Sequence, residues 1–287
     1  MNPNATTAKT DIVVAGVGGQ GILTVAFIVD HAALKHGLHF KQSEVHGMSQ
    51  RGGAVQSFLR IADQPIHSDL VPFGVADLIL AVEPVEALRY LEFLAPGGLV
   101  VASMAPFVNI ADYPEIESVL DAIAGLPRHV LVDAERLAKS AGSGRAENTV
   151  MIGAASPYLP FPPATYHELI ATLFGQKKQA LVDINIRAFE LGALASQAYA
   201  EFLARGLTPR QARLLARKLD FSVDPRPGAL DWAAAFKSAA GESLMAALES
   251  LTRPIAGRPE VARRVAALPA LPAPAVAAVT AVLTEGP

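Results

Sequence analysis

The sequence predicts an α/β fold, with a mostly parallel sheet flanked by helices and a helical C-terminal extension. Short apolar segments alternate with helical patterns in the first half of the chain. A glycine-rich turn joins the first apolar segment to the first helical pattern, and beyond about residue 148 the pattern becomes helical. Strands separated by helical segments are typical of layered folds in which helices cover a parallel sheet.

The first strand is expected at 11–17, because DIVVAGV has the composition of a buried strand. A helix follows over 20–36, with apolar residues at helical spacing that Asp30 interrupts, and Gly37 ends it. The pattern predicts further strands at 38–45, 54–61, 76–82, 99–103 and 129–133.

Several residues, proline and glycine among them, indicate where the later helices and strands begin. Pro84 suits the first position of a helix over 84–94, and Gly97-Gly98 indicate a turn into the strand at 99–103. Asn148 is expected to cap a helix that begins at Thr149. Long helices are expected at 178–205 and 208–219, the second with Thr208 as its N-cap.

Composition excludes several classes of function. The chain has 287 residues, of which 27 are acidic and 24 basic, so no overall positive charge favours nucleic acid or an anionic membrane. There is no cysteine, so these residues provide no thiol nucleophile, cysteine-ligated zinc or cysteine-ligated iron–sulfur cluster. The seven histidines include no H-E-x-x-H or comparable pair, and no metal site is expected.

Two uncharged stretches do not resemble membrane spans. Residues 12–29 include four glycines arranged as a turn, and residues 265–283 are alanine-rich and interrupted by prolines. The first ten residues lack the basic and apolar segments of a secretory signal. We therefore expect a soluble, cytoplasmic protein.

A glycine motif follows the first expected strand. Gly16, Gly18 and Gly21 satisfy G-x-G-x-x-G, with Gly19 and Gln20 between them, and a helical pattern begins there. Such turns let the backbone approach a ligand, and the helix start offers N–H groups to an anion, which favours a Rossmann-like fold. Three interpretations remain open: binding of NAD or FAD, binding of another phosphate-bearing ligand, or a purely structural turn.

The segment 44–53, EVHGMSQRGG, is polar and glycine-rich and lies between two expected strands. We expect it to emerge near the first glycine turn, where open α/β sheets place ligands. Arg51 could bind a carboxylate or phosphate through its planar guanidinium, and His46 is the local titratable group. The alternative is a loop that faces a partner. The candidate ligand-binding residues of this segment are Ser49, Gln50, Arg51, Gly52 and Gly53, with His46 and Arg51 as candidate catalytic groups.

These segments carry a family resemblance. GVGGQG at 16–21, EVHGMSQRGG at 44–53 and ADLILAVEPVEALR at 76–89 resemble the gamma-type domain of the 2-oxoacid:ferredoxin oxidoreductases. The sequence of the second segment is similar to that of the corresponding segment in the beta subunits of the indolepyruvate branch. The resemblance continues through shorter motifs at 66–68, 71–74, 94–98, 148–153 and 185–192. It covers about residues 10–200, so we expect a gamma-type domain there and a helical, Ala/Pro-rich extension of unknown role at 201–287.

The resemblance implies an accessory subunit rather than a complete enzyme. In that family a large alpha subunit holds thiamine diphosphate, Mg and 4Fe–4S clusters. The complex decarboxylates an aryl 2-oxoacid such as indolepyruvate, reduces ferredoxin and forms an aryl-acetyl-CoA, with CoA as co-substrate. The absence of cysteine from this chain agrees with clusters on the partner.

Two other hypotheses remain open from the sequence. One is a stand-alone NAD- or FAD-dependent enzyme that uses the glycine turn. The other is a non-catalytic scaffold whose helical C-terminal part binds partners.

Overall fold

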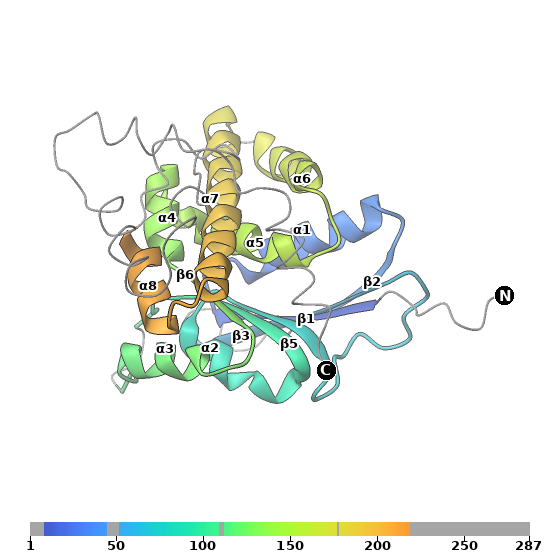
Figure 1. Cartoon of the computed structure of the whole chain (residues 1–287). Coiled ribbons are helices and arrows are strands. Elements are labelled where there is room, and N and C mark those ends of the chain that lie inside the picture. Colours follow the sequence, from blue (N-terminus) through green and yellow to red (C-terminus); the bar gives the residue numbers. More distant parts are fainter. Residues whose placement is uncertain (1–8, 45–51, 109–111, 177, 219–287) are drawn as a thin grey trace. The chain divides into compact units, whose positions relative to one another are not determined.

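The computed structural model describes residues 9–44, 52–108, 112–176 and 178–218, and Figure 1 labels its elements. Six strands form one sheet in the order β2-β3-β1-β4-β5-β6. The strands are β1 (Lys9–Val17), β2 (His39–Glu44), β3 (Ala54–Ala62), β4 (Ala76–Ala81), β5 (Leu94–Ser103) and β6 (His129–Val132). The expected α/β class is confirmed, and a strand is present in each segment where the sequence predicts one.

Helices follow most of these strands. They are α1 (Ile22–Lys35), α2 (Pro84–Arg89), α3 (Ile116–Ala124), α4 (Ala134–Ala141), α5 (Glu147–Ala155), α6 (Pro163–Gly175), α7 (Gln179–Ala204) and α8 (Pro209–Lys218). Short 3₁₀ helices are η1 (Leu91–Phe93), η2 (Gly144–Ala146) and η3 (Ser156–Tyr158). The two long C-terminal helices are confirmed. Thr208 is confirmed as a cap, since its Oγ1 accepts from Gln211 N at 3.3 Å while Gln211 Oε1 accepts from Thr208 N at 2.9 Å.

The described residues group into two units by their contacts. One is drawn from 1–129 and 160–182, and the other from 130–159 and 183–287. In the first unit, α1 packs against β1, β2, β3 and α6, whereas α2 packs against β1, β4, β5 and α3. Figure 1 shows α1 on one face of the sheet and α2 with α3 on the other. In the second unit, α4 packs against α5, and α5 crosses α7 closely.

The sheet is mixed around a buried central strand. Strand β1 is buried from Asp11 to Val17 and pairs in parallel with β4 but antiparallel with β3. Strands β2 and β3 are also antiparallel, and β4 and β5 are parallel. Only residues 45–53 connect β2 to β3, and a parallel pair would need a longer crossover.

Three local predictions are wrong. Gly97 and Gly98 lie inside β5, where the register shifts between Ala76 and Leu78, and a Cβ on Gly98 would lie 2.7 Å from Ala76 O. The helix expected over 84–94 ends at Arg89, because Glu92 O and Phe93 O accept hydrogen bonds from the 74–75 backbone instead.

The third wrong prediction is the helix cap at Asn148. Helix α5 begins at Glu147 with Ala146 as its N-cap, so Asn148 lies inside the first turn. Its side chain still satisfies a first-turn donor, because Asn148 Oδ1 accepts from Thr149 N at 2.8 Å.

Candidate functional site

Two strand-to-helix turns lie at the same edge of the sheet. Because β1 and β4 are parallel, with Ala15 opposite Ala81, both strands end there, and Val82 N donates to Ala15 O at 2.9 Å. Residues 18–21 lead from β1 into α1, and Glu83 leads from β4 into α2. Open α/β sheets bind ligands at this edge, outside the carboxyl ends of the parallel strands.

The sequence of the first turn has a steric explanation. A Cβ on Gly16 would lie 2.7 Å from Cδ1 of Ile22, so the end of that side chain would have to shift to accept a larger residue. Gly19 and Gly21 have φ of 103° and 77°, a region that side chains with a Cβ rarely adopt. Gln20 Oε1 accepts from Val17 N at 2.8 Å, which folds that side chain back onto the turn.

The two glycine motifs singled out in the sequence meet in the structure. Gly18 N donates to Gly53 O at 2.9 Å, and Gly52 N donates to Gly18 O at 3.3 Å. This exchange extends the antiparallel pairing of β1 with β3, in which Val17 lies opposite Ala54. The expectation that the second segment reaches the first glycine turn is therefore confirmed for Gly52 and Gly53.

These hydrogen bonds do not involve the other candidate residues of the segment 44–53. His46, Ser49, Gln50 and Arg51 lie outside the described residues. Their roles, and those of the glycine turn, stay predictions.

The backbone N–H groups of the glycine turn differ in whether they already donate a hydrogen bond. The N–H groups of Gly18 and Gln20 donate within the protein, to Gly53 O and Val17 O. The N–H groups of Gly19, Ile22 and Leu23 have no partner among the described residues, and the last two form the positive end of α1. This arrangement suits a carboxylate or a single phosphate group better than a chain of phosphates, because two of the turn's donors are already used.

Glu83 at the second turn is a structural carboxylate. It is 1% exposed, and its Oε2 accepts from Glu86 N at 2.9 Å as the N-cap of α2. The hydroxyl of Tyr113 donates to Glu83 Oε1, and burial together with this carboxylate raises the pKa of Tyr113.

The structure reveals one buried carboxyl that the sequence identified only as a break in an apolar helix face. Asp30 on α1 is 1% exposed, and neither of its carboxyl oxygens has a hydrogen-bond partner among the residues that the structure describes. Burial, together with the smaller effect of the charge of Glu44 at the end of β2, raises its pKa to about 7. Asp30 is therefore protonated in the fold at pH values below about 7. The available signal was a carboxylate among apolar residues in mid-helix.

Neither a metal site nor a membrane span is found in the part of the chain that the structure describes. No group of three or more His, Asp or Glu side chains there could hold a metal ion. No helix among the same residues is long and apolar enough to cross a membrane.

Comparison with known proteins identifies the family. Residues 11–195 match the sequence profile described as Pyruvate ferredoxin/flavodoxin oxidoreductase. The chain belongs to this family. Within it, the chain is 40% identical over 195 residues to the indolepyruvate oxidoreductase subunit IorB of Pyrococcus horikoshii, an alignment that covers 65% of this chain and 96% of that protein.

Solved structures agree with the fold. A 2-oxoglutarate:ferredoxin oxidoreductase from Magnetococcus marinus matches with a TM-score of 0.54 at 21% identity, over 66% of this chain and 31% of that one. The gamma subunit of a keto/oxoacid ferredoxin oxidoreductase from Geobacter sulfurreducens matches with a TM-score of 0.50 at 23% identity, over 66% of this chain and 99% of that one. At these identities the likeness establishes the Rossmann-like architecture alone.

Proposed function

We propose that this chain is the accessory (beta) subunit of an indolepyruvate:ferredoxin oxidoreductase. The observation that supports this most directly is the 40% identity to an IorB subunit over 96% of that protein's length. The complex would oxidatively decarboxylate an aryl 2-oxoacid, pass the electrons to ferredoxin and form an aryl-acetyl-CoA.

The composition of the chain supports a division of labour. With no cysteine, the chain offers no ligand of the kind that holds iron–sulfur clusters. Thiamine diphosphate, Mg and the 4Fe–4S clusters would belong to the large alpha subunit, and CoA would be the thiol substrate. This chain would contribute binding and orientation at the cleft between the subunits.

Within that cleft we assign anion binding to the edge of the sheet where β1 ends. The N–H groups of Gly19, Ile22 and Leu23, which have no partner in the described part of the chain, support an anion-binding role. Arg51 lies outside the described residues, but it directly precedes Gly52 in the sequence, and Gly52 is hydrogen-bonded to the turn. Arg51 and His46 would hold a carboxylate or phosphate of the 2-oxoacid or CoA.

Affinity purification from the native host, through a tag on this chain, tests the proposal. We expect a large partner subunit, the broad visible absorbance of iron–sulfur clusters, and indolepyruvate-dependent dye reduction that requires CoA. A colourless single chain that binds NADH would contradict the proposal and favour a dinucleotide enzyme. A coloured complex that oxidises another 2-oxoacid but not indolepyruvate would retain the class and reject the substrate.

A further inference from the structure

We propose that an apolar surface on the first unit is the docking surface for the large subunit, a proposal that rests on the proposed function. It is formed by the loop between β3 and β4 and by η1. We call it the Phe73 surface, and it consists of Asp69, Leu70, Phe73, Tyr90, Glu92 and Phe93.

The centre of the Phe73 surface is apolar and exposed. Phe73 is 66% exposed and Leu70 is 55% exposed. The ring of Phe73 lies 4.7 Å from that of Phe93, which lies 5.1 Å from the buried ring of Phe58, while Tyr90 flanks Phe93 at 6.3 Å. The exposed ring is thus the outer end of an aromatic column that is anchored in the core. Exposed apolar clusters of this kind are typical of interaction sites.

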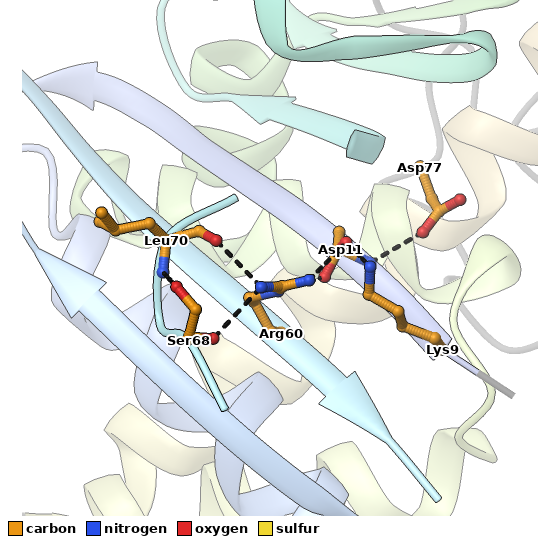
Figure 2. Close-up of polar contacts among 6 residues, drawn as sticks. All are labelled: Lys9, Asp11, Arg60, Ser68, Leu70 and Asp77. Carbon is orange, nitrogen blue, oxygen red and sulfur yellow. Dashed lines mark hydrogen bonds and ion pairs between the residues drawn. The ribbon is translucent and has the colours of Figure 1, made fainter. Parts of the chain in front are cut away.

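The backbone that presents these side chains is fixed by Arg60 on β3. Figure 2 shows the guanidinium reaching the loop, where Nη1 donates to Ser68 O at 3.2 Å and to Leu70 O at 3.0 Å. Ser68 Oγ accepts from Leu70 N at 3.2 Å. The loop therefore cannot rearrange to cover Leu70 without losing these bonds, so the surface is preorganised for a partner.

Arg60 is itself held by a buried carboxylate. Asp11 on β1 is fully buried, and it accepts from Arg60 Nε at 2.8 Å and from Lys9 (Figure 2). The far end of the loop is also tied down, since Val71 is buried, Gly74 N donates to Glu92 O and Val75 N donates to Phe93 O, both at 2.9 Å. Both ends of the apolar segment are thus attached to the sheet or to η1.

Charge indicates what the partner presents. Asp69 and Glu92 are exposed and directly precede Leu70 and Phe93 in the chain, and neither forms an ion pair within the described part of the chain. Protein interfaces combine an aromatic centre with a polar rim, and the rims of two partners are complementary in charge. The occupant is therefore a segment of the large subunit with an apolar side chain flanked by Lys or Arg.

The test measures the affinity of the full chain for the purified large subunit. We expect Phe73→Ser to raise Kd about tenfold or more, because the variant loses the apolar area that the aromatic side chain would bury against the partner. Leu34→Ser is the matched control, since Leu34 is 59% exposed on α1, outside the Phe73 surface, and should leave Kd unchanged. Thermal unfolding of both variants establishes that they are folded.

Reversing the charge of the two acidic residues provides a second test of the proposal. The double variant Asp69→Lys and Glu92→Lys should raise Kd at low salt, and the effect should shrink at high salt, whereas the effect of Phe73→Ser should persist. If folded Phe73→Ser binds the large subunit as tightly as the wild type, this inference is overturned while the proposed function stands. If the wild-type chain does not bind the large subunit at all, both are overturned. Loss of self-association in Phe73→Ser, with affinity for the large subunit intact, would make the surface a homomeric interface and overturn the inference.

Discussion

Asp30 links the stability of this protein to pH through a single carboxyl group. Burial raises its pKa from an ordinary value of 3.8 to about 7, so the folded chain holds a proton between these values that the unfolded chain has released. The stabilising contribution of the protonated form is complete below about pH 4 and is lost as the pH rises to about 7. Within that interval, each pH unit lowers the free energy of unfolding by about 1.4 kcal/mol.

Replacement of Asp30 with Asn should remove this part of the pH dependence. We expect urea unfolding at pH 5, 6, 7 and 8 to show a steeper loss of stability in the wild type than in Asp30→Asn. The comparison uses slopes because the Asn amide would also lack partners, which lowers stability at every pH. Asp69→Asn, at an exposed position, is the control and should keep the wild-type slope. Parallel curves for the wild type and Asp30→Asn would mean that Asp30 is ionised in the fold.

At the scale of elements, two glycines determine how closely α5 and α7 cross. A Cβ on Gly153 would lie 2.0 Å from Phe189 O, and a Cβ on Gly192 would lie 1.9 Å from Val150 O. The backbone of the other helix thus packs directly against each glycine. A buried hydrogen bond of 2.7 Å from Thr149 Oγ1 to Asn185 Oδ1 joins the same pair of helices. These contacts give a structural reason for the motifs at 148–153 and 185–192.

Gly153→Ala should destabilise the chain even though alanine is the better helix former. Two backbones would have to separate, and overpacking of this kind typically costs about 1–3 kcal/mol. Gly175→Ala is the matched control: Gly175 is also in a helix, but its Cβ would meet only Val182 Cγ2 at an ordinary 4.0 Å. Thermal unfolding measures both. Equal midpoints for the wild type and Gly153→Ala would show that the helices separate without cost.

Most elements were predictable because each has its own periodic pattern. DIVVAGV identified β1, and the residues after Gly37 and Gly53 identified β2 and β3. The antiparallel pairing of β2 with β3 also had a signal, since the short link lacks a helical pattern. The start of β5 had no such signal in the sequence. Gly97 and Gly98 indicate a turn unless the close approach of Ala76 O to Gly98 is known.

The candidate site was predictable only in pieces. Both glycine motifs stood out by composition, but the hydrogen bonds of Gly18 with Gly52 and Gly53 depend on the register of β1 against β3. The burial of Asp30 and the clamp made by Arg60 depend on which strands become neighbours. No local pattern contains that information.

At the scale of the whole molecule, the proposed activity would belong to a complex rather than to this chain by itself. The family profile ends at residue 195, and the aligned IorB subunit of P. horikoshii covers 65% of the chain. The matched part of the chain therefore corresponds to nearly the whole length of that relative. Residues beyond it have no counterpart in that alignment, so the contribution of this chain to catalysis is expected from the first two thirds.

The variant Arg51→Ala in the assembled complex tests how this chain contributes to catalysis. If the guanidinium holds a carboxylate or phosphate, its loss removes a charge-assisted hydrogen bond of about 1.5–3 kcal/mol, which is about a 10- to 100-fold rise in KM for the 2-oxoacid or for CoA. Arg51→Lys keeps the charge without the planar fork and should give an intermediate KM. Steady-state kinetics with each substrate varied in turn shows which anion Arg51 binds, while co-purification and the visible spectrum establish that assembly is intact. Wild-type kinetics in a correctly assembled Arg51→Ala complex would exclude Arg51 from the site and leave the amides of the glycine turn as the anion donors.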